Sequence, residues 1–85
     1  MESRVALIGI IVESNDSIEQ MNKILHMYQE YIIGRMGVPY RKRGVSIISI
    51  ALDAPSGIIS ALSGKLGMLE GISTKTIYSK IQNGQ

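Results

Sequence analysis

The chain has 85 residues, a formal net charge of +2 and a pI near 9.1, with 45% hydrophobic and 19% charged residues. A chain of this length forms one domain, placed at residues 1–85 with an ordered core at about 4–81, and so small a core is marginally stable alone. The composition excludes a disordered chain, and the absence of cysteine excludes disulfides and thiolate metal sites. Without a signal peptide or an apolar run near 18 residues, a cytoplasmic protein with no membrane association is predicted.

The first predicted element is a strand over residues 4–13, because this apolar run is too short and too rich in β-branched residues to favour a helix. Alternation gives it two apolar sides, with Ala6, Ile8, Ile10 and Val12 on one and Val5, Leu7, Gly9 and Ile11 on the other. A strand with two apolar sides predicts that both are covered.

A helix is predicted next, beginning in a polar cluster and running to about Tyr28. Ser17 and Gln20 have capping-box spacing, with Asn15 or Asp16 as alternative caps. Apolar residues at spacings of three and four form one stripe, made of Ile18, Met21, Ile24, Leu25 and Tyr28. Such a stripe is typical of an amphipathic helix that packs on a sheet.

Two β-branched runs, residues 31–36 and 45–52, predict a hairpin with a long loop between its strands. The second run again has two apolar sides, with Ile48, Ile50 and Leu52 on one and Val45, Ile47 and Ala51 on the other. The hairpin therefore supplies a second strand that needs cover on both faces.

After a turn at residues 53–57, a second helix is predicted, with Pro55 in its first turn. Its apolar stripe consists of Ile59, Leu62, Leu66 and Leu69. Gly64 indicates either a close approach to the sheet or an early helix end near Gly67. The last run, residues 72–81, has the lysines of an edge strand, and residues 82–85 are predicted as a loose tail.

The order strand, helix, strand, strand, helix, strand predicts an α+β fold, a ferredoxin-like βαββαβ sandwich with a four-stranded antiparallel sheet and two helices on one face. The first and third strands lie in the middle of such a sheet, so their second apolar side remains uncovered. We expect a homo-oligomer, a dimer or tetramer, to bury it, with interface residues Val5, Leu7, Ile11, Val45, Ile47 and Ala51. Cover by loops and the tail is the alternative.

No arrangement of residues indicates catalysis, and we predict a protein that is not an enzyme, with no catalytic residues, metal or cofactor. The single histidine, His26, lies on the polar side of the first helix, where a solvated role is expected. Gly64-Lys65 lacks the upstream glycine of a phosphate-binding loop, and the glycines of residues 34–37 do not form a dinucleotide fingerprint.

Basic residues gather around Pro39-Tyr40: Arg35 precedes them, and Arg41, Lys42 and Arg43, here named the basic tip, follow. Guanidinium groups bind carboxylates and phosphates in a bidentate manner. This density predicts a small anionic ligand bound at a subunit interface by Arg35, Tyr40, Arg41 and Arg43. A solvated hairpin tip is the alternative, and nucleic acid is less favoured because Tyr40 is the one aromatic residue available for stacking.

Four segments, VALIGIIVE (5–13), YIIGRMGVPY (31–40), RGVSIIS (43–49) and ISALSGKLG (59–67), together resemble the iron-only hydrogenase system regulators. The likeness covers nearly the whole chain, and the Gly-Arg-Met-Gly-x-Pro-Tyr run at 34–40 is its most distinctive part. The resemblance implies a small ferredoxin-like domain of anaerobic bacteria, similar to ACT domains and to the sensing domain of nickel-responsive repressors. It also implies a link to the maturation of iron-only hydrogenase.

Some features of the wider relatives are not expected here. Nickel-responsive repressors carry a ribbon-helix-helix DNA-binding segment and a His and Cys nickel site, whereas this chain starts at its first strand without those ligands. ACT domains bind amino acids through a glycine-containing turn, and the corresponding turn at residues 13–16 has no glycine. We therefore expect neither a DNA-binding domain nor direct DNA binding nor nickel.

Two hypotheses for function follow. The first is an oligomeric, ligand-sensing module, of the transcriptional regulator class, that binds a small anion and passes its state to a partner. The second is a protein-binding accessory subunit in hydrogenase maturation, which docks through the basic tip and has no small-molecule ligand. In both, the expected partners are further copies of the chain and a hydrogenase maturation or regulatory protein.

Overall fold

The computed structural model describes residues 2–80 of the chain. Its elements are β1 (Arg4–Val12), α1 (Ile18–Met27), β2 (Ile32–Tyr40), β3 (Val45–Ala54), α2 (Ser56–Gly67) and β4 (Ile72–Tyr78), with 3₁₀ turns η1 (Asn15–Ser17) and η2 (Gln29–Tyr31) on either side of α1. The predicted βαββαβ order and α+β ferredoxin-like fold are confirmed. The predicted tail, residues 82–85, lies outside the described residues.

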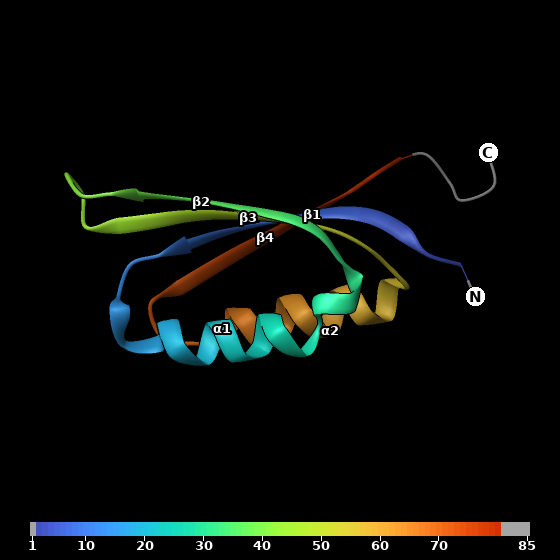
Figure 1. Cartoon of the computed structure of the whole chain (residues 1–85), viewed down its shortest axis with the longest axis horizontal. Coiled ribbons are helices and arrows are strands. Elements are labelled where there is room, and N and C mark those ends of the chain that lie inside the picture. The colour runs from blue at the N-terminus through green and yellow to red at the C-terminus, as the bar shows by residue number, and fades with distance from the viewer. Residues whose placement is uncertain (1, 81–85) are drawn as a thin grey trace.

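The four strands form one antiparallel sheet in the order β2-β3-β1-β4. Both helices lie on the same face of this sheet, and the tip of the β2–β3 hairpin extends past them at one end (Figure 1). The central strands are β1 and β3, which are also the two most continuously apolar segments. The opposite face of the sheet carries no helix, and we name it the open face.

The hydrophobic core lies between the helices and the sheet. Its buried members are Ala6, Ile8, Ile10, Val12, Met21, Leu25, Ile48, Ile50, Leu52, Ala54, Ile59, Leu62, Leu66 and Ile72. These include one alternate set from each central strand and the middle of each helix stripe, so the predicted alternation and helix periodicity are confirmed. The remaining stripe residues, Ile18, Ile24, Tyr28 and Leu69, are partly buried and pack against the core. Each fully buried Ile or Leu contributes about 1.5–3 kcal/mol to folding, which makes this layer the main source of stability.

The start of α1 differs from the predicted capping box. The Ser17 side chain makes no cap hydrogen bond to α1, and its hydroxyl donates to the Glu70 carbonyl oxygen at 2.9 Å. Ser14 is the residue that caps, because its hydroxyl accepts from the Asp16 amide at 3.2 Å and so starts the turn η1. Ser17 is buried, and a buried hydroxyl needs a hydrogen-bond partner, which the Glu70 carbonyl provides here.

The strand β2 continues four residues beyond its predicted end, and the loop of the hairpin is correspondingly short. Val38, Pro39 and Tyr40 pair with Ile47, Ser46 and Val45, which leaves the loop residues 41–44, closed by Gly44 at a φ of 66°. Proline ends a central strand because it has no N–H to donate, but an edge strand tolerates it. Because β2 is an edge strand, it can continue through Pro39.

Two predicted details of the C-terminal half are resolved by the structure. A Cβ atom placed on Gly64 would have no heavy atom within 4 Å, so this glycine does not mark a close approach to the sheet. The helix α2 ends at Gly67, as the alternative predicted. The last strand is shorter than predicted and ends at Tyr78, where the Arg4 guanidinium lies 4.4 Å from the centre of the Tyr78 ring.

Candidate functional site

The open face of the sheet is apolar along both central strands. All six residues predicted for an interface lie on it: Val5, Leu7, Ile11, Val45, Ile47 and Ala51. Leu7 is 41% exposed and Ile47 is 45% exposed, whereas Ile8 and Ile50, on the helix side of the same strands, are fully buried. The sheet therefore presents apolar side chains on both faces, and the part of the chain that the structure describes covers one of them.

This apolar surface continues onto the edge strands, for which the sequence patterns did not predict it. Met36, Val38 and Tyr40 of β2 lie on the open face, since they pair with Ser49, Ile47 and Val45 of β3. Ile77 of β4 joins them through its pairing with Leu7. Met36, Val38 and Tyr40 alternate along β2 in the sequence, but this pattern was not assigned to a strand because β2 was predicted to end at residue 36.

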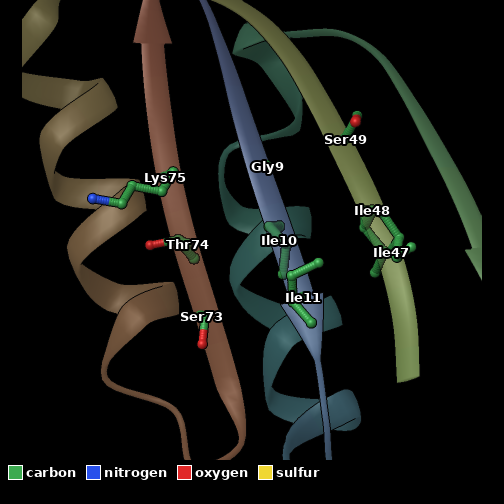
Figure 2. Close-up of a pocket in the computed structure, with 9 residues that line it drawn as sticks. All are labelled: Gly9, Ile10, Ile11, Ile47, Ile48, Ser49, Ser73, Thr74 and Lys75. Atoms are coloured by element: carbon green, nitrogen blue, oxygen red, sulfur yellow. The ribbon is translucent and has the colours of Figure 1, made fainter. Parts of the chain in front are cut away.

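A hollow of about 320 Å³ lies at the centre of the open face. It is bordered by Gly9, which has no side chain to fill the space beside Ile11 (Figure 2). Ile11, Ile47, Ser49, Ser73 and Lys75 contribute to its walls from three strands. A Cβ atom on Gly9 would lie 3.9 Å from the Lys75 carbonyl oxygen, an ordinary contact, so the fold itself does not require glycine there.

Charge is sparse on this face. Among the residues of the four strands, two charged side chains, those of Asp53 and Lys75, share it. Asp53 pairs with Val5 and Lys75 pairs with Gly9, so they lie on opposite sides of β1 and about 13 Å apart along its direction. The open face thus carries one acidic and one basic group at separate positions.

The basic tip is exposed throughout and lies at the far end of the hairpin. Its turn is held by backbone bonds from the Arg43 amide to the Tyr40 carbonyl at 3.3 Å and from the Gly44 amide to the Arg41 carbonyl at 3.2 Å. The ring of Tyr40 belongs to the open face, while Arg41 and Arg43 lie beyond the last strand pair.

Arg35 does not join these tip residues. It lies five residues before Tyr40 on an extended strand, which corresponds to about 16 Å. It also faces the other way, because it pairs with Ile50, whose side chain is buried against the helices. The structure therefore brings Tyr40, Arg41 and Arg43 close along the hairpin end and separates Arg35 from them.

Arg35 instead lines a second depression, the α1–β2 cleft, which measures about 340 Å³. Its other lining residues are Asn22, Leu25, His26, Gln29 and Ile32. Four of these follow helical spacing along α1 and η2, at positions 22, 25, 26 and 29, and so share one side. His26, predicted as a solvated residue, is exposed but borders this cleft.

The described residues 2–80 contain no cluster of three or more His, Cys, Asp or Glu side chains able to hold a metal ion. Within the same residues, neither helix is both long and apolar enough to cross a membrane.

The elements and the open face define a small ferredoxin-like domain with an uncovered apolar sheet. The family model "Iron-only hydrogenase system regulator, putative", also described as TM1266-like, matches residues 4–76. The chain belongs to this family, and the resemblance noted in its sequence is confirmed.

Among solved structures, the protein TM1266 from Thermotoga maritima is 36% identical in sequence with a TM-score of 0.89, over 93% of this chain and 100% of that one. A formyltetrahydrofolate deformylase from Pseudomonas putida KT2440 is 13% identical with a TM-score of 0.61, over 85% of this chain and 28% of that one. The second likeness shows a shared fold alone. The comparison with curated proteins gives no match.

Proposed function

We propose that this chain is a ligand-sensing regulatory module of the iron-only hydrogenase system, which works as a homo-oligomer joined through its open face. The observation that carries the proposal is the apolar surface that runs across all four strands opposite the helices. The family description supports the regulatory role and the link to the hydrogenase system.

A second copy of the chain is the occupant that best fits the open face. A domain of 85 residues has little core with which to stabilise itself, and burying a second apolar face adds to that core. An isologous pair brings the acid of each copy to the base of the other when its two-fold axis lies midway between the two positions, and a surface with one acid and one base is then self-complementary. Asp53 and Lys75 give the open face this property, and its remaining strand residues are uncharged.

Regulation also requires that a ligand change the conformation or association of the module. The basic residues favour a small anion as this ligand. Arg41 and Arg43 of the basic tip, with Tyr40, form one candidate binding group, and Arg35 in the α1–β2 cleft forms another. Arg41 and Arg43 lie beyond the last strand pair and Arg35 lines the α1–β2 cleft, so self-association leaves these guanidinium groups accessible to solvent, while the ring of Tyr40 lies at the margin of the open face.

The mass of the purified chain at micromolar concentration tests the self-association. Light scattering should give twice or four times the 9.3 kDa of one chain, and dilution should lower that value toward 9.3 kDa. A mass of one chain across the whole concentration range would contradict the proposal.

The exposed basic tip favours the accessory-subunit function as a second candidate, because three consecutive cations at the end of a hairpin form a docking point for an acidic protein surface. If the tip docks a hydrogenase maturation protein, replacing Arg41, Lys42 and Arg43 by glutamine should abolish co-purification with that protein. Arg35→Gln is the matched control, since it removes a cation elsewhere. Co-purification that survives the triple replacement would remove the tip from this role.

A further inference from the structure

We propose that the α1–β2 cleft is a binding site for a small organic carboxylate, with Arg35 as the residue that holds its charge. This inference rests on the proposed ligand-sensing function and deepens it, because it selects one of the two basic groups and names the class of ligand. The lining residues of the cleft favour an anion, and an irregularity in β2 directs Arg35 into it.

The direction of Arg35 results from a β-bulge. Ile32 pairs with Leu52, but the next pair joins Gly34 to Ala51, so Ile33 is an extra residue in β2. Strict alternation from Ile32, which packs against the core, would put residue 34 on the helix side and residue 35 on the open face. The extra residue reverses this order, and Arg35 points toward α1. Bulges re-aim side chains in this way beside functional sites.

The charges of the cleft fit an anion. Arg35 supplies a guanidinium group, His26 supplies an imidazole ring, and none of the lining residues is acidic. The guanidinium group is planar and binds the two oxygens of a carboxylate side by side. The amides of Asn22 and Gln29 are donors as well as acceptors, and they border the same space.

The floor of the cleft favours an organic anion over an inorganic one. Leu25 is buried and Ile32 half-buried, and both present hydrocarbon between the polar side chains. The carbon skeleton of a ligand would rest on this floor while its carboxylate meets Arg35. A volume of about 340 Å³ suits a molecule of a few carbon atoms, since pockets for small ligands start near 300 Å³.

The strand β2 also links this cleft to the open face. Arg35 and its neighbours Gly34 and Met36 also line a shallow depression there, together with Leu7 and Ala51. A ligand that fixes Arg35 therefore restrains the strand whose alternate residues belong to the proposed interface. By linkage, a ligand that strengthens association by some factor must bind the oligomer more tightly than the monomer by that same factor.

Titration of the uniformly ¹⁵N-labelled chain with propionate, succinate and benzoate, monitored by amide chemical shifts, tests the site. Inorganic phosphate and 1-propanol are the comparison compounds. At least one carboxylate should give saturable shifts centred on Gln29, Ile32 and Arg35. Phosphate and propanol should each bind at least tenfold more weakly than that carboxylate.

Variants then separate the two basic groups. Arg35→Gln should weaken the carboxylate at least tenfold, and Arg35→Lys should restore part of the loss. The double variant Arg41→Gln with Arg43→Gln removes two cations from the tip and should leave the affinity within twofold. Each variant should keep the wild-type urea midpoint, because all three side chains are exposed.

Three results would overturn the site: no saturable shift with any carboxylate, shifts centred on residues 40–44, or phosphate binding as tightly as the best carboxylate. Such a failure is distinguishable from failure of the proposed self-association. An oligomeric mass without carboxylate binding would leave the open face as the interface and remove the cleft alone.

Discussion

Replacing Ile47 by lysine is expected to dissociate the oligomer and leave the fold intact. Full burial of an isoleucine is worth about 1.5–3 kcal/mol, and about half of this side chain is already covered within one copy. In a symmetric interface both copies of Ile47 bury the part of the side chain that is still exposed. The replacement therefore weakens association by about 1.5–3 kcal/mol, or roughly 10- to 150-fold in the dissociation constant. Two ammonium groups on the apolar surface weaken it further. Sedimentation equilibrium measures the change.

Met68→Lys is the matched control for this replacement. Met68 is an exposed apolar residue too, but it lies at the end of α2, on the helix side of the molecule. It gains the same charge and should keep the wild-type dissociation constant within about twofold. Equal weakening by both variants would mean that general charge repulsion, and not the open face, determines association.

Among the glycines that the structure describes, replacing Gly71 by alanine is expected to cause the largest loss of stability, about 3 kcal/mol or more. Gly71 has a φ of 77°, a conformation that costs an L-residue about 1–2 kcal/mol. A Cβ atom here would also lie 2.6 Å from the Ser14 Cβ and 3.2 Å from the Ser14 amide nitrogen. To relieve these contacts, the loop would have to move away from Ser14. The hydrogen bond that the Glu13 amide donates to the Gly71 carbonyl at 2.7 Å opposes this movement.

Gly44→Ala separates the two causes of that loss. Gly44 has a similar φ of 66°, but a Cβ atom on it would meet nothing within 4 Å. Urea unfolding at equal chain concentration should therefore show a loss of about 1–2 kcal/mol for Gly44→Ala. Adding Ser14→Gly to Gly71→Ala should recover part of the larger loss, since it removes the nearest atom. Equal losses for the two alanine variants would contradict the predicted clash.

The layer structure follows from local patterns in the sequence. Alternation in β1 and β3 identifies both the core set and the open-face set, because a strand's side chains must alternate. The helix stripes fix the side that packs on the sheet. These signals lie within single elements, so Leu7 and Ile47 could be assigned to a common face without a structure.

The candidate ligand site depends on features that the sequence does not reveal. Arg35 and Tyr40 are near in sequence, but the pleat of β2 and the extra residue Ile33 place them on different faces. The position of a bulge depends on pairing with β3, which no local pattern specifies. His26 and Arg35 are nine positions apart, and the packing of α1 beside β2 brings both to the same cleft.

Contacts between copies in solution show whether copies of this chain join through the open face. Chains labelled with ¹³C at the methyl groups are mixed with unlabelled chains, and nuclear Overhauser effects between the two populations are recorded. Contacts are expected to the methyl groups of Leu7, Ile11 and Ile47, and none to those of Met27 and Met68. Contacts confined to the helix-side methionines, or none at any concentration, would contradict it.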